Sequence, residues 1–161
     1  MKPQPLTWLV IALALLEATV PPVLGAQGKP LTVTGVRGIT FGVVFPGVPS
    51  VVVRTDAANA GQFDIGYAKF SPIQITFTLP AVMTGPAGAT LPLVFGANDG
   101  GYSSPETITS QVGFDPRVAF ATALDKNGRA AVFIGGTAQP LTSQRAGNYT
   151  ATITMTITVL P

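Results

Sequence analysis

The sequence predicts an all-β protein, an immunoglobulin-like antiparallel β-sandwich that follows an N-terminal signal peptide. Short runs of β-branched and aromatic residues recur along the chain, and 18 glycines and 15 prolines among its 161 residues supply turns between them. No long segment shows the 3.6-residue hydrophobic period of an amphipathic helix. Eight or nine short strands at this spacing favour two packed sheets, with a closed barrel as the alternative.

The first 26 residues are expected to form a secretory signal peptide. Lys2 precedes an apolar run over residues 6–16, and the sequence Pro-Pro-Val-Leu-Gly-Ala follows over residues 21–26. A basic start, a hydrophobic core of this length and small residues after it are typical of such a peptide. A membrane anchor would need about 20 apolar residues, and Glu17 interrupts the run first. We therefore expect an exported protein, in the periplasm, at the cell surface or outside the cell, with a single domain over residues 27–161.

Composition narrows the chemistry of the exported chain. It contains no cysteine and no histidine, so it has no disulfide and lacks the commonest general base and metal ligand. Without Lys2 and Glu17, the nine basic and seven acidic residues become eight and six, a net charge of +2. This balance is too small and too dispersed to predict binding of nucleic acid.

The stretch from Asn148 to Leu160 gives the clearest strand signal. Apolar residues alternate with threonines along it, and successive side chains of a strand point to opposite faces. At about 3.3 Å per residue it would span roughly 40 Å, longer than most strands, so we expect a bend, a bulge or a frayed end. The residues expected on its core face are Tyr149, Ala151, Ile153, Met155, Ile157 and Val159.

Further strands are predicted at short intervals. Pro92 has no N–H to donate to a neighbouring strand, so we expect its strand to lie at a sheet edge. Asp125–Gly128 has the composition of a hairpin turn, and Thr107–Phe114 is ambiguous. The predicted strands are Leu31–Thr34, Ile39–Phe45, Val51–Val53, Phe63–Tyr67, Ile73–Leu79, Leu91–Phe95, Val118–Leu124 and Arg129–Ile134. The expected core comprises Phe41, Val43, Ile75, Phe77, Val132, Ile134, Ile153, Met155 and Ile157.

No constellation of residues points to catalysis, a cofactor or a metal ion. Asp56, Asp99 and Asp125 lie in turn-like sequence, where carboxylates accept hydrogen bonds from nearby backbone N–H groups. The pair Lys69 and Ser71 lacks any sign of the buried lysine that a Ser–Lys nucleophile requires. The sequence therefore predicts that the protein is not an enzyme and needs no cofactor.

Three short motifs carry a resemblance to a known family. They are Ile39-Thr40-Phe41-Gly42, Phe133-Ile134-Gly135-Gly136, and Ala146-Gly147-Asn148-Tyr149 at the start of the Thr-rich last strand. In these motifs the chain, over about residues 31–160, resembles a family of small exported bacterial proteins, a domain of unknown function. That family is similar to the spore-coat-U-like and Mat-type fimbrial subunits of Gram-negative bacteria. The resemblance implies an immunoglobulin-like sandwich at the cell surface that assembles into thin fibres by donor-strand exchange.

Two functions of different classes follow. The first is a structural surface protein, a pilin-like or coat-like subunit, whose partners are other copies of itself or related subunits. Leu31 and Val33 would lie on the exchanging strand, because they alternate in a short segment near the expected cleavage site. The same two residues could instead close their own sandwich. The second function is a monomeric binding module, secreted or periplasmic, with a ligand site in a turn such as Gly96–Ser104, where Tyr102 is the only aromatic residue.

Overall fold

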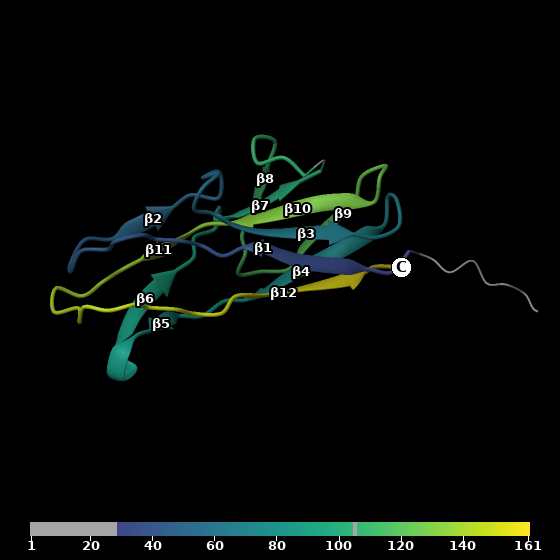
Figure 1. Ribbon diagram of the computed structural model, residues 1–161. Coiled ribbons are helices and arrows are strands. Elements are labelled where there is room, and N and C mark those ends of the chain that lie inside the picture. Colours follow the sequence, from purple (N-terminus) through teal and green to yellow (C-terminus); the bar gives the residue numbers. More distant parts are fainter. Residues whose placement is uncertain (1–28, 105) are drawn as a thin grey trace, which may run out of the picture.

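The computed structural model describes residues 29–104 and 106–161, which form antiparallel strands arranged in three sheets and one short 3-10 helix (Figure 1). The expected signal peptide over residues 1–26 lies outside these described residues. Within them, no helix combines the length and apolar character needed to cross a membrane. The all-β class and the sandwich predicted from the sequence are confirmed.

Two sheets pack face to face to form the body of the sandwich. The five-stranded sheet has the order β1-β3-β10-β7-β8, and the three-stranded sheet has the order β12-β4-β9. The strands of the first are β1 (Thr32–Arg37), β3 (Gly61–Gly66), β10 (Arg129–Ile134), β7 (Gly100–Ser103) and β8 (Val112–Phe114). Those of the second are β12 (Thr154–Val159), β4 (Pro72–Thr78) and β9 (Phe120–Ala123).

A third, four-stranded sheet extends the molecule at the end away from the C-terminus (Figure 1). Its order is β2-β11-β6-β5, and the 3-10 helix η1 connects its last two strands. The bounds are β2 (Ser50–Val52), β11 (Gly136–Ala138), β6 (Thr90–Val94), β5 (Val82–Thr84) and η1 (Pro86–Gly88).

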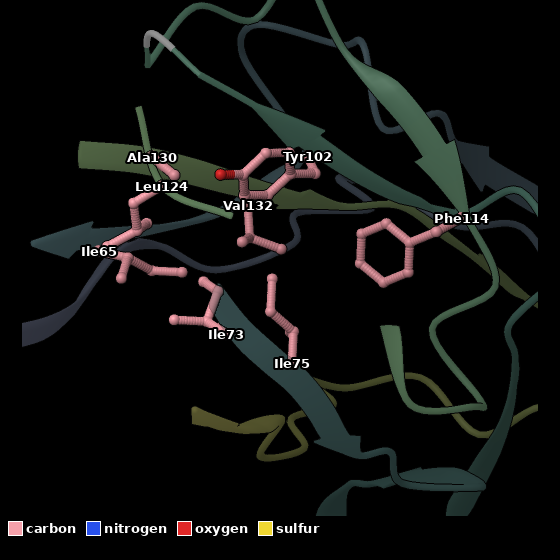
Figure 2. Close-up of a cluster of buried hydrophobic side chains, with 8 residues drawn as sticks. All are labelled: Ile65, Ile73, Ile75, Tyr102, Phe114, Leu124, Ala130 and Val132. Carbon is pink, nitrogen blue, oxygen red and sulfur yellow. The ribbon is translucent and has the colours of Figure 1, made fainter. Parts of the chain in front are cut away.

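The main core lies between the five-stranded and three-stranded sheets. Figure 2 shows Ile73 and Ile75 of β4 facing Ile65 and Val132 from the opposite sheet, and all four side chains are buried. Aromatic rings extend this core: Phe114 of β8 stacks on the Phe120 ring of β9 with centroids 4.3 Å apart. A second cluster lies under the four-stranded sheet and contains Met83, Leu91, Leu93, Phe95, Ile134 and Ala138.

The strand predicted over Ile39–Phe45 is wrong, because the structure has no strand between Arg37 and Ser50. Gly42 has a φ of +66°, and this left-handed turn of the backbone breaks the alternation on which the prediction depended. Val43, predicted to be in the core, is instead 84% exposed. Ile39 and Phe41, before the turn, do pack against the second core cluster.

Two predictions about sheet neighbours are also wrong. Pro92 lies on β6, which is an interior strand between β11 and β5. Its carbonyl accepts the Gln139 N–H at 2.9 Å. The residues of β6 that pair with β11 are Leu93 and Val94, so no hydrogen bond of the sheet requires the N–H that proline lacks.

The turn Asp125–Gly128 is tight, with Gly128 N donating to Asp125 O at 3.0 Å, but it does not form a hairpin. It joins β9 to β10, which lies in the opposite sheet.

Candidate functional site: an open seam between β1 and β12

The first and last strands form two edges on the same side of the sandwich. β1 pairs only with β3, and β12 pairs only with β4, in both cases antiparallel. β1 and β12 belong to different sheets, and they run next to each other in the view of Figure 1. The end of β1 and the residues just before β12 line the same groove. The outer edge of each strand therefore has no neighbouring strand among the described residues. We call this side of the molecule the seam.

Side chains that face inward along the seam are not fully covered. Val33 lies opposite Ile65, and Val159 lies opposite Ile73, so each valine shares the core-facing side of its sheet with a buried isoleucine. Nevertheless Val33 is 42% exposed and Val159 is 39% exposed, whereas Ile65 and Ile73 are almost completely buried. The two edge strands therefore leave apolar surface of the sandwich interior in contact with solvent.

The structure places both residues of the predicted exchange segment at this seam. Leu31 immediately precedes β1 and packs against the main core, and Val33 lies within β1. β1 is paired to β3 of its own chain over most of its length, with an irregularity between Gly35 and Arg37. Five of its six residues are exposed, and the side-chain bonds that hold it are Thr32 Oγ1 to Gly66 O at 3.0 Å and Arg37 Nε to Ala60 O at 2.7 Å.

The final strand is shorter than predicted, and from Thr154 to Thr158 its faces are as the alternation indicates. Ala151, predicted on the core face, lies before the strand and is exposed. Met155 and Ile157 lie opposite Phe77 and Ile75 and pack against the main core, while the threonines of β12 are exposed on the other face. Before Thr154 the chain leaves β4, and the only ladder contact described there is a bridge between Thr150 and Thr84. Ile153 packs against the second core cluster.

This departure of the chain opens a groove of about 430 Å³ at one end of the seam. One wall is the end of β1 and the segment after it, Gly35–Ile39, and the other wall is formed by residues 149–151 and Ile153. Its floor is apolar and comes from four strands of two sheets, through Phe63, Met83, Leu93 and Ile134. The groove is thus a slot between two stretches of backbone, with a floor formed by the half-buried Phe63 and the buried side chains of Met83, Leu93 and Ile134.

Tyr149 fixes one wall of the groove. Its hydroxyl donates to the Arg145 carbonyl at 2.7 Å and accepts from Gln144 Nε2 at 2.6 Å. The ring lies so close to Gly85 that a Cβ at that position would overlap it. The Tyr149 hydroxyl therefore bonds within its own loop. The groove itself depends on side chains from four strands and could not be predicted from any one motif.

The alternative ligand site in Gly96–Ser104 has no exposed aromatic side chain. Tyr102 is buried in the main core, and its hydroxyl donates to the Ala123 carbonyl at 2.6 Å (Figure 2). Burial raises the pKa of this phenol, which keeps it protonated. The turn therefore does not present the ring that the sequence suggested for it.

The acidic side chains serve the turns in which they lie, as predicted. Asp56 accepts from the Ala58 and Asn59 N–H groups, Asp99 from Gly96 N, and Asp125 from the N–H groups of Asn127 and Arg129. The hydrogen bond from the Asn59 side chain is the main reason that the pKa of Asp56 is lowered. Among the described residues, no group of three Asp, Glu, His or Cys side chains could hold a metal ion, and Lys69 of the Lys69–Ser71 pair is exposed.

Comparisons with family models and with curated proteins add no relative for this chain. No protein-family model matches it, and a search of the curated proteins finds no match. The functional argument therefore depends on the seam, the groove and the surface of the molecule.

Proposed function

We propose that this protein is an exported structural subunit of the bacterial surface, pilin-like or coat-like, whose copies join along the seam. β1 is the strand that passes from one copy to the next, with Leu31 and Val33 as the side chains that enter the neighbouring sandwich. The observation that supports this most is that β1 is held by one neighbour, is mostly exposed, and borders apolar surface that the chain itself leaves open.

The energetics of β1 permit its exchange with a neighbouring copy. A strand that buries little apolar surface contributes little to stability, since burial supplies roughly 25 cal/mol per Å². When β1 of a second copy pairs with β3, the same main-chain hydrogen bonds form, so the exchange costs no pairing. Copies linked in this way form an open chain whenever each donates its β1 to the next.

A chain that lacks residues 27–34 tests the proposal. We expect this deletion variant to lose the assemblies formed by the full exported protein, as seen by electron microscopy and size-exclusion chromatography. It should also bind an added peptide with the sequence of residues 31–34, because the part of the β3 edge that pairs with residues 32–34 is then vacant. A peptide with aspartate in place of both Leu31 and Val33 is the matched control and should not bind.

One outcome of these experiments would contradict the proposal. If the full exported protein is a monomer under all conditions and the deletion only lowers its stability, then Leu31 and Val33 close their own sandwich and the proposal is wrong.

A second candidate is a monomeric secreted or periplasmic binding module, which the groove favours. Its volume of about 430 Å³ lies within the roughly 300–1,000 Å³ typical of ligand pockets, and its floor is apolar. A monomeric protein that binds the apolar dye anilinonaphthalene sulfonate, and loses this binding in Ile153→Glu, would support the binding module in place of the subunit.

A further inference from the structure

Long stretches of the described chain carry no charged side chain. Residues 38–53, 70–98, 130–144 and 146–161 contain no Asp, Glu, Lys or Arg. Every strand of the four-stranded sheet and of the three-stranded sheet lies within these ranges or within the equally uncharged β9. Two complete sheets therefore have no ionisable side chain.

The four-stranded sheet also exposes large apolar side chains on its outer face. Val51 of β2 lies opposite Thr137 of β11, which in turn lies opposite Val94 of β6, so the three form one row across the sheet. Their neighbours in sequence, Val52, Ala138 and Leu93, face the other way and are buried. Val51 is 63% exposed, and Val53 and Val94 are exposed as well.

The loop that leads into β2 also exposes large apolar side chains. Val48 N donates to Phe45 O at 3.1 Å in a turn, and Gly47 N donates to Leu141 O, so the turn is fixed against the chain that follows β11. Phe45 at 66% and Val48 are exposed on it. We define the β2 patch as Phe45, Val48, Val51, Val53 and Val94.

We propose that the β2 patch binds the same patch on a second copy of this chain, across a two-fold axis. In a two-fold interface each residue near the axis meets its own copy, so any charge there would face a like charge. A sheet whose strands carry no charge avoids this repulsion, and a group of exposed large apolar side chains of this kind marks an interaction site. β2 is an edge strand without the lysine or aspartate that usually blocks edge pairing.

A lipid surface fits the β2 patch less well. Binding to anionic membranes depends on clustered Lys and Arg beside the apolar residues. The basic residues that flank residues 38–53 are Arg37, whose Nε donates to Ala60 O, and Arg54, whose Nε is buried. Neither forms a basic cluster with the patch. The contact is also separate from the seam, so it does not depend on exchange of β1.

Sedimentation of the exported protein, measured with substitutions at Val51, tests the two-fold contact. We expect Val51→Lys to raise the dissociation constant of the dimer at least about tenfold, because two lysines then face each other. Val51→Glu should do the same, and an equimolar mixture of the two variants should recover the dimer. Val118→Lys is the matched control, since Val118 is 61% exposed in the loop between β8 and β9 and lies outside the patch.

Three results would overturn the proposal: a wild-type protein that stays monomeric at high concentration, equal loss of the dimer in Val118→Lys, or no recovery on mixing the two Val51 variants. Phe45→Lys provides a second variant in a loop, should a change within β2 disturb the sheet. Binding of the wild-type monomer to vesicles of neutral phospholipid would assign the patch to a membrane and also contradict the proposal.

Discussion

The side-chain roles that could be predicted best from the sequence are those that depend on local hydrogen bonds. The carboxylates of Asp56, Asp99 and Asp125 bond to N–H groups at most four residues away, so their roles require no knowledge of the fold. Tyr149 is similar, because its partners Gln144 and Arg145 lie in the same loop. Val43 was mispredicted for the opposite reason. Its exposure follows from the left-handed backbone at Gly42, which a glycine permits but does not require.

Asp115 provides a test at this scale. Arg117 forms a two-pronged ion pair with it, at 2.8 and 2.7 Å, and these side-chain hydrogen bonds lower the pKa of the carboxyl from 3.8 to about 2. Because the pKa is lower in the folded state, the stabilisation is complete above about pH 4. It is lost as the pH falls through about 2. An NMR titration should show this midpoint, and Arg117→Gln should move it back toward 3.8. An unchanged midpoint in that variant would mean that the ion pair does not form.

The Tyr149 hydroxyl gives a second test. Tyr149→Phe removes two hydrogen bonds but keeps the ring against Gly85. We expect a loss of about 1–2 kcal/mol in the free energy of unfolding, measured in urea, because the Arg145 carbonyl and the Gln144 amide lose a partner. The control Tyr67→Phe removes a hydroxyl without a side-chain hydrogen bond to it among those described, and it should have a smaller effect.

At the scale of whole elements, alternation predicted the faces of strands better than their lengths or neighbours. Ile73 and Ile75 of β4 are buried and Thr78 is exposed, as the period of two indicates. β12 was predicted from Asn148 but begins at Thr154, because residues before it leave β4 to form the wall of the groove. The strands β5 and β11 were not predicted, since three residues are too few to show a period.

Two substitutions on β4 test the assignment of its faces. Ile75→Asp places an unpaired charge in the main core and should lower the free energy of unfolding by several kcal/mol, or prevent folding. Thr78→Asp, three residues along the same strand on the exposed face, should change it by about 0.5 kcal/mol or less. Comparable losses in both variants, measured by thermal and urea unfolding, would show that both faces of β4 are buried.

For the molecule as a whole, composition sets the response to pH. The chain has no histidine and no cysteine, and the shifted carboxyl pKa values of Asp56, Asp115 and Asp125 are all below the usual value. The side chains described here therefore change their charge little between pH 5 and pH 8. We expect a free energy of unfolding that is flat across this range and decreases below about pH 4. A transition near pH 6.5 would contradict this account.

Neither the topology of the molecule nor the candidate site could be predicted from the sequence. Turn residues between β9 and β10 suggested a hairpin, but the two strands lie in opposite sheets because β10 pairs with β3 and β9 with β4. The seam lies between β1 and β12, at opposite ends of the described residues, and the floor of its groove combines Phe63, Met83, Leu93 and Ile134. Such long-range pairings depend on the relative stability of whole sheets, which short motifs do not encode.

The most direct test of the proposed assembly uses a cysteine on each side of the β1–β3 ladder. Thr34 and Asp64 are direct partners in this ladder, and the chain contains no cysteine of its own. Directly opposed residues of an antiparallel pair lie about 4.5–5.5 Å apart at Cα, a spacing compatible with a disulfide. The Thr34→Cys chain and the Asp64→Cys chain are exported together from one cell. Exchange of β1 predicts a disulfide between the two chains on a non-reducing gel, and none when each is exported alone. If the mixed chains stay unlinked, while a chain with both cysteines closes its own disulfide, β1 remains in its own sandwich and the central claim is contradicted.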